Sequence, residues 1–221
     1  MLNRPVLQPV FHFTYMSLWK IVSTIAMLCL GSLQTVRAEN STPPGLRVEL
    51  EAMGESDQVH RLEARAVAEK FGHNSAENAA LWEKQNAIDG ANIKRLVEIL
   101  EGSGWPQQSI VGGKAAGAAF FVLQHASLQH QKRFLPMLRE AVANSEARPQ
   151  YLALLEDRIL VREGRPQMYG SQLGVDPITG KHSFRLIEDE ANVDRRRSAV
   201  GLEPLAEYAK RFGFIYERPK Q

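Results

Sequence analysis

The sequence has very little cysteine and no marked excess of charge of either sign. Its 221 residues include a single cysteine, Cys29, and 27 basic against 25 acidic residues, for a formal charge of +2. One cysteine cannot form an internal disulfide or a cysteine zinc site. A charge this small gives no general case for nucleic acid as a partner. Glycine and proline are present at ordinary levels, so the composition is that of a globular protein.

Motifs of several common enzyme classes are also missing. There is no Gly-x-Ser-x-Gly sequence, and Gly112-Gly113-Lys114 lacks the spacing of a phosphate-binding P-loop. His125 and His130 are five residues apart, about 140° around a helix, whereas helical zinc pairs are four apart. Arg195-Arg196-Arg197 follows an acidic run and is not a nucleic-acid patch. We therefore expect no metal and no cofactor.

Only one long apolar run is present, Ile21 to Leu33. It follows Lys20 and precedes Val36-Arg37-Ala38, and it is too short to span a hydrocarbon core of about 30 Å. These features predict a signal peptide over residues 1–38, whether translation begins at Met1 or Met16, and hence a periplasmic or extracellular protein. After cleavage no stable membrane span would remain. An uncleaved membrane anchor is the alternative interpretation.

Cleavage after Ala38 would leave 183 residues with a charge of −1 and no cysteine. A domain of this size can bury a sufficient core by packing alone. Residues 39–55 contain Ser-Thr-Pro-Pro-Gly and are expected to be a linker or arm. We expect residues 56–213 to form a single helical domain and residues 214–221 a C-terminal tail.

The spacing of apolar residues predicts a mainly α fold, a helical bundle of about seven helices with one small β-hairpin. The segment from Ala115 to Leu123 is rich in small apolar residues, which suits a central helix packed closely on its neighbours. Expected helices are about 57–71, one capped by Ser75, one capped by Asp89 and ending before Gly102, then 113–125, 129–143, 151–162, 193–200 and 204–212, with strands in 167–175 and 182–187.

His125 is the first candidate for reactive chemistry. It follows Gln124 at the end of an apolar helix, and imidazole is the side chain best able to move a proton near neutral pH. The alternative is a core histidine that holds a helix end by hydrogen bonds.

Asp157 and Arg158 lie within an otherwise apolar helix. Adjacent helical positions point about 100° apart, so at least one of the two side chains is expected to turn inward. Asp157 would then orient His125 and Arg158 would hold an anionic group of a ligand. The alternative is a structural salt bridge.

The segment Gln167-Met168-Tyr169-Gly170-Ser171-Gln172 is rich in polar groups suited to a ligand. In an extended strand Gln167, Tyr169 and Ser171 would share one face, and Gly170 would allow close approach. The alternative is a strand edge whose amides bind loop backbone.

The chain resembles a family of uncharacterised, often exported bacterial proteins, a domain-of-unknown-function family. The resemblance covers about residues 56–210, departs from the family at Ser171, where threonine is expected, and implies a fold and a site location but no activity. It rests on Asp89 and Asn92, Gly104-Trp105-Pro106, Gln124-His125, Asp157-Arg158, Gln167, Tyr169-Gly170, Gln172, Asp194, Arg197 and Gly201-Leu202.

Two functions remain open at this point. The first is an exported protein with a site for a small polar or anionic ligand, capable of metal-independent acid–base chemistry of the hydrolase type. The second is a non-enzymatic periplasmic interaction module whose polar residues form a structural network. The sequence names neither a substrate nor an oligomeric state. The expected catalytic residues are His125, Asp157, Arg158 and Tyr169, and the expected ligand-binding residues are Gln124, Gln167, Gln172 and Arg197.

Overall fold

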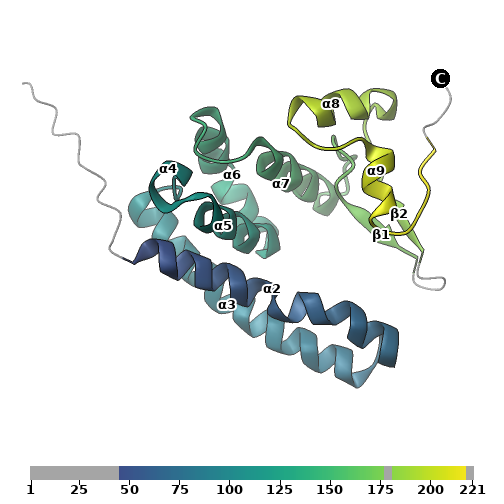
Figure 1. Cartoon of the computed structure of the whole chain (residues 1–221), viewed down its shortest axis with the longest axis horizontal. Coiled ribbons are helices and arrows are strands. Elements are labelled where there is room, and N and C mark those ends of the chain that lie inside the picture. Colours follow the sequence, from purple (N-terminus) through teal and green to yellow (C-terminus); the bar gives the residue numbers. More distant parts are fainter. Residues whose placement is uncertain (1–44, 177–180, 218–221) are drawn as a thin grey trace, which may run out of the picture. The chain divides into compact units, whose positions relative to one another are not determined.

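The structure is a computed structural model that describes residues 45–176 and 181–217 (Figure 1). The predicted signal peptide lies outside this range, as does most of the turn predicted at 176–180. Within it the fold is mainly α, as predicted, with eight α-helices and one two-stranded antiparallel sheet. The elements are α2 (Leu46–Phe71), α3 (Ala76–Ser103), α4 (Gln108–Val111), α5 (Gly113–His125), α6 (Leu128–Ala143), α7 (Pro149–Arg162), β1 (Leu173–Val175), β2 (His182–Phe184), a 3-10 turn (Glu190–Asn192), α8 (Val193–Ala199) and α9 (Leu205–Lys210).

Helix α2 begins ten residues before the expected start near Ser56. Residues 46–55, which we expected to form part of a linker or arm, are helical. Leu46, Leu50 and Met53 recur at helical spacing in this segment, and all three are buried in the main core. The prediction was wrong because it weighed the local composition and missed this apolar face.

Helix α3 is continuous where the sequence predicted two helices (Figure 1). Ser75 caps it as predicted, because its hydroxyl accepts a hydrogen bond from the backbone N–H of Asn78 at 3.1 Å. Asp89 does not cap a helix. Its carboxylate binds Arg61 and Gln85, so the side chain that suggested a helix start contacts α2 instead.

Helix α5 is the central helix that its small residues predicted. It packs against α2, α3, α4, α6 and α7, and Ala115, Ala119 and Leu123 are fully buried. A Cβ added to Gly54 on α2 would lie 2.6 Å from the Cβ of Ala118. The two helices therefore approach more closely there than any larger side chain at position 54 would allow.

The last part of the described chain builds a second, smaller apolar cluster. Ile187, Val193 and Leu205 form its buried centre, and Phe184 packs on Tyr216 from the segment predicted to be a tail. Strands β1 and β2 pair antiparallel as predicted, but they are three residues long each and 167–172 lies outside them. Of the helices in the described ranges, none has the length and apolarity needed to cross a bilayer.

Candidate functional site

His125 pairs with a buried carboxylate of α2. Its Nδ1 lies 2.9 Å from Oδ1 and 3.0 Å from Oδ2 of Asp57. The Asp57 side chain is 1% exposed, whereas the imidazole is 20% exposed. A carboxylate in this position accepts a hydrogen bond from Nδ1–H and fixes both the ring orientation and the tautomer. Nε2 then remains for proton transfer, since no described residue is hydrogen-bonded to it.

A polar network fixes Asp57 in turn. Gln58 donates to Asp57 Oδ2 at 2.6 Å, and Arg61 lies one helical turn farther along α2, with Nη1 3.5 Å from Asp57 Oδ1. Arg61 also holds Asp89 of α3 through two hydrogen bonds, at 2.6 and 3.0 Å. Gln85 donates to Asp89 at 2.8 Å. Three helices, α2, α3 and α5, therefore converge on one set of charges.

The charge of Asp89 is stabilised by these contacts. Burial by itself would raise the pKa of the Asp89 carboxyl, but the hydrogen bonds from Arg61 and Gln85 outweigh burial and lower the pKa below its ordinary value. Asp89 therefore stays ionised at neutral pH and balances Arg61.

Arg158 supplies a partly buried positive charge near this network. The Gln124 amide oxygen, when it faces Arg158, accepts from Nε at 2.8 Å and from Nη2 at 3.2 Å. Burial, followed by the positive charges of Arg162 and Arg61, lowers the pKa of the Arg158 guanidinium to about 10. Among the described residues no carboxylate forms an ion pair with Arg158. No described carboxylate therefore neutralises the Arg158 guanidinium. Its partner Gln124 directly precedes His125 in α5.

Arg162 adds a second positive charge one turn along α7. It donates to the backbone oxygen of Ala126 at 2.7 Å, immediately after α5 ends at His125. Burial lowers its pKa, and no carboxylate within the described ranges is paired with it. Gln131 donates to the backbone oxygen of Gln124 at 2.7 Å, so the end of α5 is held on two sides.

Asp157 has a different role from the one expected. Its carboxylate accepts hydrogen bonds from the backbone N–H groups of Met168, Tyr169 and Ser171 at 2.7 to 3.2 Å. Burial raises its pKa, and these backbone donors oppose the shift. The expectation that Asp157 orients His125 is therefore wrong, because the carboxylate at the ring belongs to Asp57.

The other predicted polar residues of the C-terminal part also bind backbone. Gln167 is fully buried, and its amide bonds to the backbone of Gln172 and Arg185. Arg197 is 1% exposed and donates to the backbone oxygens of Glu203 and Tyr169. Contacts of this kind fix a loop rather than a ligand. They match the structural network of the second hypothesis in this region of the chain.

Gln172 and Tyr169 belong to the same loop. The side-chain amide of Gln172 donates to the hydroxyl of Ser171 at 3.0 Å. Tyr169 uses its backbone N–H for Asp157 and its backbone oxygen for Arg197. The phenol beside Arg158 is instead that of Tyr208, whose pKa is raised by burial. Of the eight predicted site residues, the structure pairs Gln124 with Arg158, and His125 follows Gln124 at the end of α5.

Sequence reasoning missed Asp57, Arg61, Gln85 and Tyr208. The first two are four residues apart, as are Gln85 and Asp89, and this spacing places each pair on one helix face. These polar pairs lie on helix faces that also carry buried apolar residues, and this pattern was the signal in the sequence that could have identified them. No group of three or more His, Cys, Asp or Glu residues in the described ranges could hold a metal ion.

Comparison with known protein families gives one match for the sequence. Residues 44–217 match the profile described as a family of unknown function, DUF6624. The chain belongs to this family. The resemblance to a domain-of-unknown-function family is thereby confirmed, whereas export and the motif assignments remain predictions. No curated protein and no solved structure matches the chain.

Proposed function

We propose that this DUF6624 protein binds a small anionic molecule between His125 and Arg158 and that His125 transfers a proton to or from it. One observation carries the proposal. A partly exposed imidazole is oriented by a buried carboxylate, and Gln124, the residue before it, binds a partly buried arginine that no described carboxylate compensates. An uncompensated buried cation is costly, and an anionic ligand would balance it.

Each residue of the proposed site has a role that follows from its chemistry. Arg158, supported by Gln124, would bind the anionic group by charge-assisted hydrogen bonds. Asp57 would hold the Nδ1–H tautomer, so that Nε2 accepts a proton from the reacting group or from water. Arg61 and Asp89 would keep Asp57 and the ring in place. The reaction class that fits is acid–base catalysis of the hydrolase type.

Ligand binding can be tested before a substrate is known. The midpoint of thermal unfolding is measured with increasing inorganic phosphate for the wild type, Arg158→Gln and Arg133→Gln. Arg133 is an exposed arginine of α6 that pairs with Glu101, so its variant is the matched control. We expect phosphate to stabilise the wild type and the control but not Arg158→Gln, since a ligand stabilises only the state that binds it. Equal stabilisation of all three proteins contradicts the proposal.

Catalysis is tested with a panel of chromogenic phosphate and carboxylate esters. Removing a general acid or base costs on the order of 10²- to 10⁴-fold in rate, so His125→Gln is expected to lose kcat by that factor. Arg158→Gln is expected to raise KM. A substrate hydrolysed equally well by the wild type and by His125→Gln would exclude His125 as the proton carrier.

We further propose that the protein acts after export. The apolar run from Ile21 to Leu33 and the Val36-x-Ala38 sequence support this proposal. Mass spectrometry of the protein recovered from its native cell is expected to give Glu39 as the first residue. A cytoplasmic protein that retains residues 16–38 would contradict it.

A further inference from the structure

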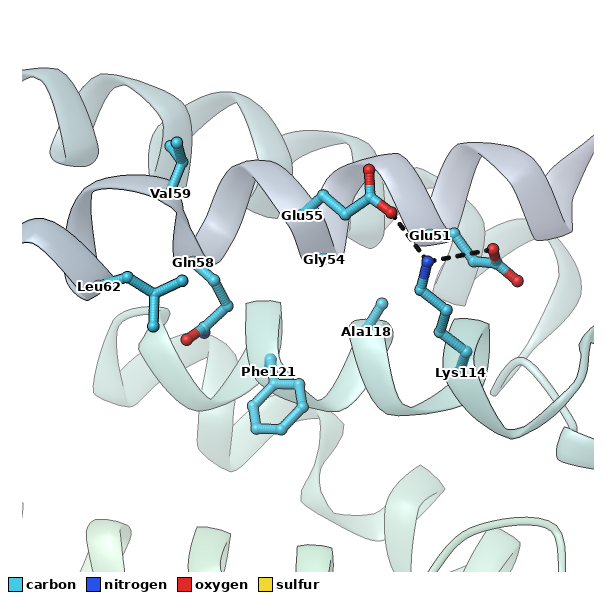
Figure 2. Close-up of a pocket in the computed structure, with 9 residues that line it drawn as sticks. All are labelled: Glu51, Gly54, Glu55, Gln58, Val59, Leu62, Lys114, Ala118 and Phe121. Atoms are coloured by element: carbon cyan, nitrogen blue, oxygen red, sulfur yellow. Dashed lines mark hydrogen bonds and ion pairs between the residues drawn. The ribbon is translucent and has the colours of Figure 1, made fainter.

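A groove with apolar walls lies between α2 and α5 on the surface (Figure 2). Its volume is about 440 Å³, within the range of small-molecule sites. Leu62 and Phe121 stand over it and are 77% and 39% exposed. Exposed side chains of this size along a concave surface mark a place where something apolar binds.

The groove is a consequence of the close helix crossing. Gly54 and Ala118 meet at its floor, where neither residue has a side chain that could fill the surface. Larger side chains flank this floor. Figure 2 shows Leu62 and Gln58 of α2 extending toward α5 on the same side as Phe121. The small residues at the helix crossing and the larger ones beside it thus form the groove.

One end of the groove is closed by charge. Lys114 of α5 lies 2.8 Å from Glu55 and 3.5 Å from Glu51, and both ion pairs are drawn in Figure 2. Arg47 also pairs with Glu51, so two cations balance the two carboxylates at this end of the groove.

The other end of the groove lies toward His125. Gln58 lines the groove, and its amide donates to Asp57, the partner of His125. Phe121 also lines the groove and lies one helical turn before His125, on the same face of α5. At 1.5 Å per residue, the helix from Lys114 to His125 spans about 16 Å. The groove therefore comes within one helical turn of His125 on α5, and Gln58 and Asp57 link its lining to the imidazole by hydrogen bonds.

We infer that the groove holds the aliphatic chain of an amphipathic substrate whose anionic group lies at Arg158 and His125. The inference rests on the proposed function and names the class of molecule that the site takes. A linear chain fits the groove better than an anionic membrane surface does. Such a surface attracts clustered basic residues, whereas the lysine here is paired with two glutamates.

The test measures affinity by titration calorimetry for inorganic phosphate, butyl phosphate and octyl phosphate. Each methylene that enters the groove should tighten binding about two- to fourfold, given the transfer free energy of a methylene group. We expect octyl phosphate to bind at least about tenfold more tightly than butyl phosphate. Leu62→Glu should abolish this difference and leave binding of inorganic phosphate unchanged.

Leu186→Glu is the matched control, because Leu186 is 73% exposed and Leu62 is 77% exposed. The same affinity for the three phosphates in the wild type would overturn the groove but not the anion site. An equal effect of both Leu→Glu variants would also overturn it. Binding to phosphatidylglycerol vesicles, lost in Leu62→Glu, without binding of monomeric octyl phosphate would assign the surface to a membrane instead. Failure of Arg158→Gln to weaken inorganic phosphate would refute the proposed function itself.

Discussion

Replacing the partly buried Arg158 and the buried Arg197 by methionine should change stability in opposite directions. Arg158 and Arg197 both have pKa values lowered first of all by burial. Arg197 nevertheless has a full set of protein partners, since it donates to two backbone oxygens and stacks at 4.9 Å on the ring of Tyr208. Arg158, by contrast, donates its hydrogen bonds to the side-chain amide oxygen of Gln124. We expect Arg158→Met to raise the free energy of unfolding and Arg197→Met to lower it.

The magnitudes follow from the structure. Lowering the pKa of Arg158 from its ordinary value to about 10 means that folding disfavours its charged form by about 3 kcal/mol. Methionine keeps much of the length and removes the charge, but it leaves the Gln124 oxygen unpaired, at a cost of about 1 kcal/mol. The expected net gain is about 1 to 2 kcal/mol. Arg197→Met leaves two backbone oxygens without a partner and should cost about 2 to 5 kcal/mol.

Urea unfolding followed by circular dichroism at neutral pH measures both effects. The slopes of the unfolding transitions should agree among the three proteins, so that the midpoints report stability directly. A loss of stability in Arg158→Met as large as in Arg197→Met would refute the reasoning, because it would mean that the protein itself satisfies Arg158. A gain would show that this charge is kept at a cost to folding, which is typical of functional residues.

Three other predictions concern the framework of the site. Asp89→Asn should destabilise the protein at neutral pH by about 1 to 3 kcal/mol. Because contacts with Arg61 lower the folded-state pKa of Asp89, the difference in stability between the variant and the wild type should shrink as the pH falls below the ordinary value of 3.8. Unfolding measured at a series of pH values tests this dependence. Asp157→Asn keeps a single acceptor oxygen for three backbone donors, so it should lower the free energy of unfolding by about 1 to 3 kcal/mol. It should also increase hydrogen exchange in residues 168–171. Unchanged exchange would argue against the role of Asp157 in the loop. Gly54→Ala should lower the free energy of unfolding by about 1 to 3 kcal/mol through overpacking against Ala118. Adding Ala118→Gly should restore stability, as measured by chemical unfolding. A double variant no more stable than Gly54→Ala would contradict the close contact.

Local patterns predicted the helices well where an apolar face and its end signals agreed. Ser75 and the small residues before His125 gave a cap and a central helix that the structure confirms. The pattern failed where a polar side chain had two uses. Asp89 is a good helix cap by residue type, yet it contacts Arg61 across to α2, and the helix continues through it.

The sequence alone placed His125 at the end of an apolar helix and Arg158 within another, because helix periodicity depends on neighbours along the chain. It could not show that Asp57, 68 positions before His125, supplies the carboxylate at the ring, or that Asp157 binds a loop. Both residues are acidic and both lie in amphipathic helices, so nothing local distinguishes them. Only the packing of α2 against α5 decides which carboxylate meets the imidazole, since that contact is set by the crossing at Gly54 and Ala118 and not by the residues beside His125.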